Sequence, residues 1–548
     1  MKIALRLCIA LAVSLGLFSG TANAQIEVKD PDEGDRIFKI DKLFDDPWAA
    51  THSDFAFWGN YAALGWYTGS TGGVHLYDIS DPANPVEKRN FLCNGNQNDP
   101  IFWDRNGNDV PDLMLLAVDR TMAGTSCGAA VSNNPDGSRF DANPQGWEGV
   151  RVFEMSDGSN DYENGAPFAV INQVDAQYTD CGAHTITAYT SFADDPANPR
   201  LVVYVSSYPL RPGPTCGTLL QGLPAGQEPY KNVNNQFEDP SDREVENPLH
   251  GAIQVLNVPL NNPANTTEIA EPEISYPGDP DGKFDYTERG LTGLEPASIA
   301  CHDIVVHPED NIAGGACAEQ GQIWEVDPAT GIPDTENPMG IGDDALSSDG
   351  EGQFPGAVDF FHSVMFDNGM ETVNWVDESF GSGCPTMTNW QARDWHAAGT
   401  HKTGRMFFSD MEGNFQSEFH VGDTRPDPRA DEYCSAHMGM TVTGIKRDLL
   451  VNAWYTGGVN VIDFTKPERL KEVAYYDMAR QTGTWSAYPY TGPMFDKGPG
   501  IPVYASDGVE LNAEARGMEV YRPIVEKPPP KFRLDHLNPQ TMDFEDRK

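Results

Sequence analysis

Short runs in which apolar and polar residues alternate recur along the chain, and they predict β-strands. Residues 60–68 and 448–456 are two closely matched examples. Each is followed by a glycine-containing turn and by another apolar run that ends in Asp-x-x-x-Pro, at 74–82 and 459–467. Glycine and proline number 53 and 42, which indicates many turns and few long helices.

This unit is repeated along the chain. Its closing run recurs at 149–154, 251–256, 322–327 and 517–521, with a less regular copy from Arg405. Each unit opens with a related strand, and the seven opening strands start at His52, Asn98, His184, His302, His362, His437 and Ser486. One unit cannot bury its core alone, but a closed ring of units can. The sequence therefore predicts an all-β fold, a seven-bladed β-propeller.

The ends of the chain suggest how the ring closes. The last unit has no fourth strand of its own, because the proline-rich run at 525–530 cannot donate a full ladder of hydrogen bonds. We expect residues 36–43 to supply that strand. The predicted organisation is a signal peptide at 1–24, an N-terminal segment with the closing strand at 25–50, the propeller at 51–523 and a flexible, charged, proline-rich tail at 524–548.

Several phrases of the sequence are similar to those of a known family. "VHLYDISDPANP" and "VNVIDFTKP" resemble the LVIVD-repeat proteins of bacteria, which are exported β-propellers with largely unassigned function. "DCGAHT", "ACHDIVVHPE", "FFHS", "YCSAH" and "WYTGGVNVIDFT" resemble a subgroup whose repeats carry these histidines. The likeness extends from about residue 50 to 522. It implies the fold and export, but no chemistry, because fold does not supply function.

The N-terminus has the features of a secretory signal. Lys2 and Arg6 precede an apolar run at 7–17, and Ala22-Asn23-Ala24 is a small-residue cleavage site. The run is too short to span a bilayer, and no later stretch is long enough. The mature protein is therefore expected to begin at Gln25 and to be periplasmic or secreted.

Cysteine usage agrees with an oxidising compartment. Removal of Cys8 with the signal leaves eight cysteines, an even number with no C-x-x-C spacing. Structural disulfides are the favoured interpretation. Of the 105 pairings that eight cysteines allow, neighbour pairing would link 93–127, 181–216, 301–317 and 384–434.

The net charge narrows the range of partners. A formal charge of −45 argues against nucleic acid and anionic membranes as partners. It is compatible with divalent cations, although an acidic surface also simply keeps an exported protein soluble. A small molecule or a metal ion is the favoured partner, and a protein partner remains open.

The histidines at the strand openings are candidate metal ligands. Opening strands line the channel of a propeller, so His52, His184, His302, His362 and His437 are expected to ring its mouth, and a subset to bind a transition metal. Neutral imidazole is a good ligand for copper, iron and zinc. Rings of three or four such histidines resemble, in architecture, the iron site of carotenoid-cleaving oxygenases. The alternative is that each histidine only hydrogen-bonds backbone at its own blade.

A loop in the second unit has the spacing of a structural calcium site. Asp104, Asn106, Asn108 and Asp112 place oxygen-bearing side chains at loop positions 1, 3, 5 and 9. Calcium takes six to eight oxygens, which alternate residues of a tight loop can supply. The alternative is an ordinary hairpin turn rich in Asn and Gly.

No familiar catalytic motif accompanies these features. The sequence has no G-x-S-x-G, H-E-x-x-H, Walker or dinucleotide-binding pattern. Carboxylates at the ends of second strands, Asp119, Asp377 and Glu378, are placed to reach the rim. The leading hypothesis is an exported propeller whose His-lined axial pocket binds a metal ion or small ligand. The alternatives are a metal-dependent oxidoreductase and a cell-surface protein-interaction scaffold.

Overall fold

A computed structural model gives the structure of the protein. It describes residues 28–29, 37–38, 40–45, 50–68, 71–131, 147–157, 167–179, 182–190, 197–207, 252–275, 301–317, 320–342, 354, 358, 361–378, 404–421, 435–443, 445–476, 483–492, 500–509, 517–523, 534 and 536–542. The predicted signal peptide at 1–24 lies outside these residues. Within them, no helix is long and apolar enough to cross a membrane.

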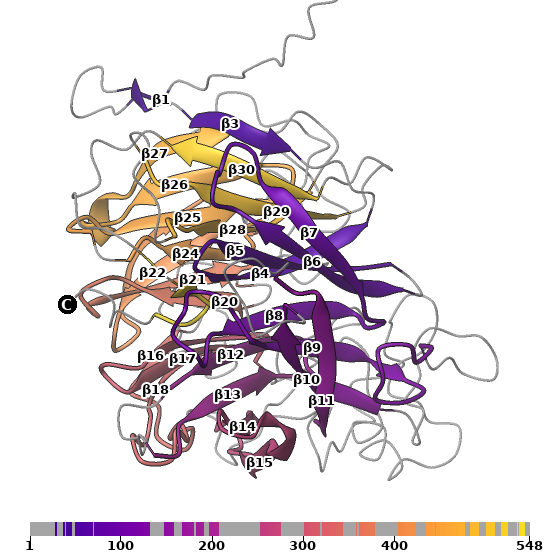
Figure 1. Cartoon of the computed structure of the whole chain (residues 1–548). Coiled ribbons are helices and arrows are strands. Elements are labelled where there is room, and N and C mark those ends of the chain that lie inside the picture. The colour runs from indigo at the N-terminus through magenta and orange to yellow at the C-terminus, as the bar shows by residue number, and fades with distance from the viewer. Residues whose placement is uncertain are drawn as a thin grey trace, which may run out of the picture.

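Seven antiparallel sheets surround a common centre, so the predicted seven-bladed β-propeller is confirmed (Figure 1). Blades 1 to 3 consist, from the inside outwards, of β4 (Thr51–Trp58), β5 (Tyr61–Tyr67), β6 (Gly72–Asp78), β7 (Val86–Leu92); β8 (Gln97–Trp103), β9 (Leu113–Met122), β10 (Trp147–Ser156), β11 (Val170–Tyr178); and β12 (Thr185–Tyr189), β13 (Arg200–Ser206), β14 (Gln254–Pro259), β15 (Thr267–Ala270).

Blades 4 to 6 are β16 (Asp303–His307), β17 (Ile312–Cys317), β18 (Gln320–Glu325), β19 (Gly340–Gly342); β20 (Phe361–Phe366), β21 (Thr372–Asp377), β22 (Met406–Asp410), β23 (Phe415–Phe419); and β24 (Gly439–Thr441), β25 (Leu449–Ala453), β26 (Val459–Asp463), β27 (Lys471–Tyr476). All seven opening strands predicted from the sequence are the innermost strands of their blades. Two short 3-10 helices, Pro263–Asn265 and Pro467–Arg469, precede the outer strands of blades 3 and 6.

Blade 7 combines the two ends of the propeller sequence. It contains β28 (Gly483–Pro489), β29 (Val503–Val509), β30 (Met518–Pro523) and, as the outer strand, β3 (Ile40–Asp45). The register pairs Ile40 with Pro523 and Asp45 with Glu519. The N-terminal segment thus adds a strand to the last blade, a few residues later in the chain than we expected. The small hairpin of β1 (Val28–Lys29) and β2 (Ile37–Phe38) precedes it.

Burial falls from the centre to the rim of each blade. Every residue of β12 and β16 is buried, whereas β7 and β15 are mostly exposed. Inner strands pack against neighbouring blades on both faces, and this is why their apolar residues are not interrupted by charged ones at every second position. The channel wall is therefore the most fully buried part of the blades, and side chains at the same register lie at one level.

Hydroxyl side chains join neighbouring blades around the channel. Three residues that directly follow an opening histidine donate a hydrogen bond to a carbonyl of the next blade: Ser53 to Gln97 O (2.6 Å), Thr185 to His302 O (2.7 Å) and Ser363 to His437 O (3.4 Å). In blade 7, Ser486 occupies the opening position itself and donates to Ser53 O at 3.3 Å. These bonds explain the recurrent Ser or Thr in the opening strands. They also fix the position of each opening histidine along the channel axis.

The prediction of a flexible tail at 524–548 is wrong for its later part. Residues 536–537 form β31, which pairs with β4 on the channel side of blade 1. Asn538 then exchanges two hydrogen bonds with the backbone of Phe102 in blade 2, both at 3.0 Å. Beyond it, Val306 of blade 4 donates to Gln540 O and accepts from Met542 N, each at 2.8 Å.

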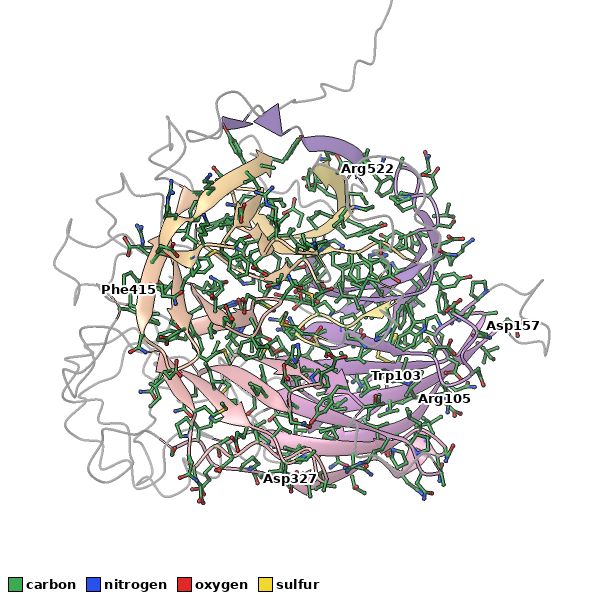
Figure 2. The ribbon with its side chains drawn as sticks, turned by 90° about the vertical axis from the view of Figure 1, so that its left-hand side faces the viewer. Trp103, Arg105, Asp157, Asp327, Phe415 and Arg522 are labelled. Atoms are coloured by element: carbon green, nitrogen blue, oxygen red, sulfur yellow. A yellow bond between two sulfur atoms is a disulfide. The ribbon has the colours of Figure 1, made fainter. Side chains whose placement is uncertain are left out.

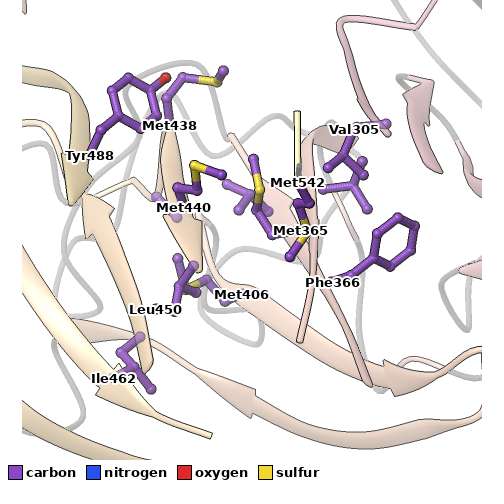
Figure 3. Close-up of a cluster of buried hydrophobic side chains, with 14 of the residues drawn as sticks. Val305, Met365, Phe366, Met406, Met438, Met440, Leu450, Ile462, Tyr488 and Met542 are labelled. Carbon is purple, nitrogen blue, oxygen red and sulfur yellow. The ribbon is translucent and has the colours of Figure 1, made fainter. Parts of the chain in front are cut away.

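This C-terminal plug, residues 534 and 536–542, is buried in the channel. Leu537 and Met542 are 2% and 0% exposed. Met542 lies in an apolar cluster with Met365, Met438 and Met440, side chains that come from the inner strands of blades 5 and 6 (Figure 3). Composition suggested a free tail because the segment is short and polar. Its backbone, however, pairs with β4 and β16, and its Asn538 and Thr541 side chains bind the backbone of β8 and β12.

Candidate metal centre

Four of the five predicted histidines form a continuous arc at one end of the channel. Their ring centroids lie 4.4 Å apart for His184 and His302, 3.8 Å for His302 and His362, and 4.1 Å for His362 and His437. The four come from blades 3, 4, 5 and 6. All are at least 96% buried, since their exposed fractions are 2%, 4%, 0% and 1%.

Hydrogen bonds at Nδ1 orient three of these imidazoles. His302 Nδ1 lies 3.1 Å from His362 O, and His437 Nδ1 lies 2.5 Å from Trp485 O. A carbonyl oxygen only accepts, so both rings carry their proton on Nδ1 and present the lone pair of Nε2. His184 directs Nδ1 to Asp119 Oδ2 at 2.9 Å. Such outer contacts are the usual way to fix the tautomer of a metal-binding histidine.

Glu378 closes the arc at its blade 5 and blade 6 end. Its Oε2 lies 3.6 Å from His362 Nε2, and its Oε1 lies 4.0 Å from His437 Nε2. Among the described residues, these three form the one group of His, Cys, Asp or Glu side chains whose ligand atoms all lie within 4.8 Å of one another. The Tyr455 hydroxyl donates a hydrogen bond to Glu378 Oε1 and so holds the carboxylate from outside.

Burial disfavours charge on the side chains of the ion-free site. Desolvation, then the neighbouring histidines, lowers the pKa of His302 and His362 well below the ordinary value, and desolvation lowers that of His437 to about 3. Desolvation raises the pKa of Glu378 to about 7. Neutral imidazole is the form that binds metal. A bound divalent cation would stabilise the ionised form of this buried carboxylate.

The fifth predicted ligand, His52, does not join the arc. Its ring stacks on His75 at 5.6 Å, and its Nδ1 lies 3.2 Å from Asp507 O. Desolvation lowers its pKa to about 3. His52 therefore fits the alternative to metal binding, in which an opening histidine only hydrogen-bonds the backbone.

Blades 2 and 7, which lack the histidine, contribute the preceding residue instead. The Gln97 amide nitrogen lies 3.0 Å from His184 Nε2, and Trp485 packs against His437 at 4.5 Å. Asn98 and Ser486 themselves turn away, to Trp66 O and Ser53 O. The arc does not extend to these two blades, and its open side is bordered by the Gln97 amide and the Trp485 indole.

Backbone strain accompanies the site. Tyr455 has φ 45°, and Gln97 and Asn98 have φ 62° and 54°, the left-handed region that non-glycine residues seldom adopt. Tyr455 is held there by two hydrogen bonds with Thr484 of blade 7, at 3.1 and 3.2 Å. Such strain costs about 1–3 kcal/mol per residue and gathers at functional sites. The sequence did not single out Gln97 or Tyr455, although Trp-Tyr-Thr recurs at 66–68 and 454–456.

Two disulfides lie among the described residues, Cys93–Cys127 and Cys301–Cys317, and both belong to the neighbour pairing. The other two predicted pairs, 181–216 and 384–434, involve residues outside the described ranges. Cys301 directly precedes His302, whose amide donates to Ala316 O at 2.8 Å. The bridge therefore anchors one histidine of the arc.

Replacing Cys301 and Cys317 together with serine should destabilise the protein by about 3 kcal/mol, because the bridge closes a loop of 16 residues. Urea denaturation of oxidised wild type and of the double variant measures the difference. An unchanged midpoint would mean that the bridge does not constrain the unfolded chain.

The predicted calcium loop is satisfied by its own hydrogen bonds. The Asp104 carboxylate accepts from the amides of Asn106, Gly107 and Asp109 at 2.7–2.9 Å. Asp112 pairs with the Arg105 guanidinium at 3.1 Å, at the rim of the molecule (Figure 2). The arrangement is that of a self-bonded turn. Calcium binding through Asp104, Asn106, Asn108 and Asp112 stays a prediction, and it would require Arg105 to leave Asp112.

Comparison with known proteins adds little to this picture. No family model matches the sequence, and no curated protein matches it. Among solved structures, the crystal structure of Chaetomium thermophilum Raptor aligns with 89% of this chain and 29% of that chain, at 9% identity and a TM-score of 0.44. This chain thus spans less than a third of the length of that protein. The strand pairing within this chain itself establishes the seven-bladed β-propeller fold.

Proposed function

We propose that this protein binds a transition-metal ion at the mouth of its propeller channel. The observation that carries the proposal is the convergence of His362, His437 and Glu378, with ligand atoms all within 4.8 Å. His302 is placed to act as a fourth ligand, because its ring lies 3.8 Å from that of His362. Two or three imidazoles with one carboxylate suit zinc, iron and copper.

We also infer that the protein works outside the cytoplasm. The two described disulfides are compatible with an oxidising compartment. The signal-like N-terminus and the resemblance to exported LVIVD-repeat proteins point the same way. A metal-binding role in the periplasm or outside the cell is the function that these features support together.

Metal analysis of protein made without a histidine tag tests the proposal. Wild type should hold close to one equivalent of zinc, iron or copper, either as purified or after loading with that metal and gel filtration. His362→Ala and His437→Ala should each lose it. His75→Ala, a buried histidine on β6 outside the arc, is the matched control and should retain it. Metal-free wild type that takes up none of the three ions would overturn the proposal.

A further inference from the structure

The Cys93–Cys127 disulfide joins two blades, and its two cysteines differ in their access to solvent. Cys93 directly follows β7, the outer strand of blade 1, and Cys127 lies between β9 and β10 of blade 2. Cys93 is 0% exposed. Cys127 is partly exposed, and its neighbours Ser126 and Gly128 are exposed. A thiolate that arrives from solvent therefore approaches the bridge at Cys127 rather than at Cys93.

A buried arginine lies against the inner sulfur of this bridge. Arg151 on β10 is 0% exposed, and its guanidinium donates a hydrogen bond to Cys93 Sγ at 3.2 Å. The same guanidinium donates to backbone carbonyls next to each cysteine, namely Asn94 O, Thr125 O at 2.9 Å and Ser126 O at 3.4 Å. These bonds hold the positive charge in place beside the sulfur.

The charge of Arg151 has no anionic partner among the described residues. Its contacts there are the sulfur, the three carbonyls and the ring of Trp147, whose centroid lies 5.0 Å from the guanidinium carbon, and none is a carboxylate. Desolvation lowers the pKa of Arg151 to about 10, so the group still carries its charge at neutral pH. A buried charge is unfavourable unless it is paired. An anion at Cys93 Sγ would supply the counter-charge.

This arrangement has the two properties that thiol–disulfide exchange requires. A disulfide opens faster when the attacked sulfur is accessible and when the other sulfur leaves as a stabilised thiolate. Cys127 has the access, and a neighbouring arginine is one of the groups that stabilise a thiolate, here at Cys93. The second described bridge differs in access, because Cys301 and Cys317 are 2% and 0% exposed.

We propose that the Cys93–Cys127 bridge is a thiol-exchange site, at which a low-molecular-weight thiol modifies Cys127 and releases Cys93. The thiol loses its proton to solvent, and its sulfur attacks Cys127 Sγ. A new sulfur–sulfur bond forms at Cys127, the bond to Cys93 breaks, and its electron pair leaves on Cys93 as a thiolate beside Arg151. A second thiol molecule can then attack the mixed disulfide, which frees Cys127 and yields the disulfide of the small thiol. The opened bridge no longer ties the outer edge of blade 1 to blade 2.

Exposure of folded wild type to reduced glutathione at neutral pH tests the exchange within one molecule. Peptide mass spectrometry after rapid alkylation should find glutathione on Cys127 and not on Cys93. The Cys301–Cys317 bridge is the matched control and should open at least about tenfold more slowly, because both of its cysteines are buried. Equal opening rates for the two bridges, or glutathione attached to Cys93, would contradict the proposal.

A titration tests the role of Arg151 separately. Cys127→Ser leaves Cys93 as a thiol, and its thiolate absorbance at 240 nm, measured against wild type, should reach half its full value at least about one pH unit below the ordinary thiol value of about 8.5. Adding Arg151→Gln should move this midpoint above 8.5, because only burial then acts on the thiol, whereas Arg151→Lys keeps the charge and should keep the low midpoint.

These variants distinguish a charge effect from simple docking of the loop around Cys127. If Arg151 only docked that loop, the Gln and Lys variants would titrate alike, and that result would refute the proposal. Should Arg151→Gln fail to fold, the titration of Cys127→Ser alone decides: a midpoint at or above about 8.5 leaves Cys93 without a stabilised thiolate and refutes the proposal as well.

Discussion

Truncation of the chain before Leu534 should destabilise the propeller by more than about 5 kcal/mol. Loss of one buried leucine or methionine side chain costs about 2–5 kcal/mol, and the plug buries Leu537 and Met542 almost completely. Removal also leaves the Phe102 and Val306 backbone groups without their plug partners in a channel that water reaches poorly. Urea or thermal denaturation, followed by tryptophan fluorescence, measures the loss.

Two further chains give this experiment its controls. A chain that ends at Met542 keeps the whole described plug and should match wild type. Leu537→Ala should lose about 2–4 kcal/mol by itself, since it leaves a cavity against Phe57. If the truncated chain unfolded at the wild-type midpoint, the channel would not depend on its C-terminal segment.

Replacing Glu378 with glutamine should weaken metal binding by more than about 100-fold. The carboxylate is the one anionic group within ligand distance of His362 and His437 among the described residues, and loss of an outer-shell contact alone costs about 10–100-fold. Tyr455→Phe removes the hydrogen bond that holds Glu378 and should cost about tenfold. Competition with a chromophoric chelator at fixed pH gives both affinities.

The double variant makes this prediction specific. Because Tyr455 acts through Glu378, the pair of substitutions should weaken binding no more than Glu378→Gln alone. Glu472→Gln, a buried glutamate that accepts from Asn460 in blade 6, is the matched control and should bind normally. Unchanged affinity in Glu378→Gln would place the ion among the histidines only.

The periodic pattern of the sequence was sufficient to predict the ring. Strand alternation and the turn residues are local signals that repeat in unit after unit, and the Asp-x-x-x-Pro ending marks two of the units. Placing a histidine at the opening of an inner strand also put it at one end of the channel, because equivalent positions of a closed ring lie at one level. This shared level brings the rings of four histidines close to one another: His184, His302, His362 and His437.

Other features depend on contacts that no local pattern contains. His52 occupies the same sequence position as the four histidines of the arc but turns to His75 and Asp507 O. Tyr455 reaches Glu378 across 77 residues, from one blade to the next. Asn538 finds the backbone of Phe102 across 436 residues. The sequence of the plug is polar and follows a proline-rich run, so it predicts a free segment. Only the folded channel provides the backbone donors and acceptors that bind it.

The sequence by itself therefore determined the blade count, the inner strands and the level at which the histidines lie, because these follow from short-range periodicity and ring closure. Only the tertiary structure decided which histidines meet, which carboxylate joins them and where residues 536–542 lie. Those outcomes depend on side-chain direction and on hydrogen bonds between distant segments, which satisfy buried polar groups wherever the packed fold brings partners together.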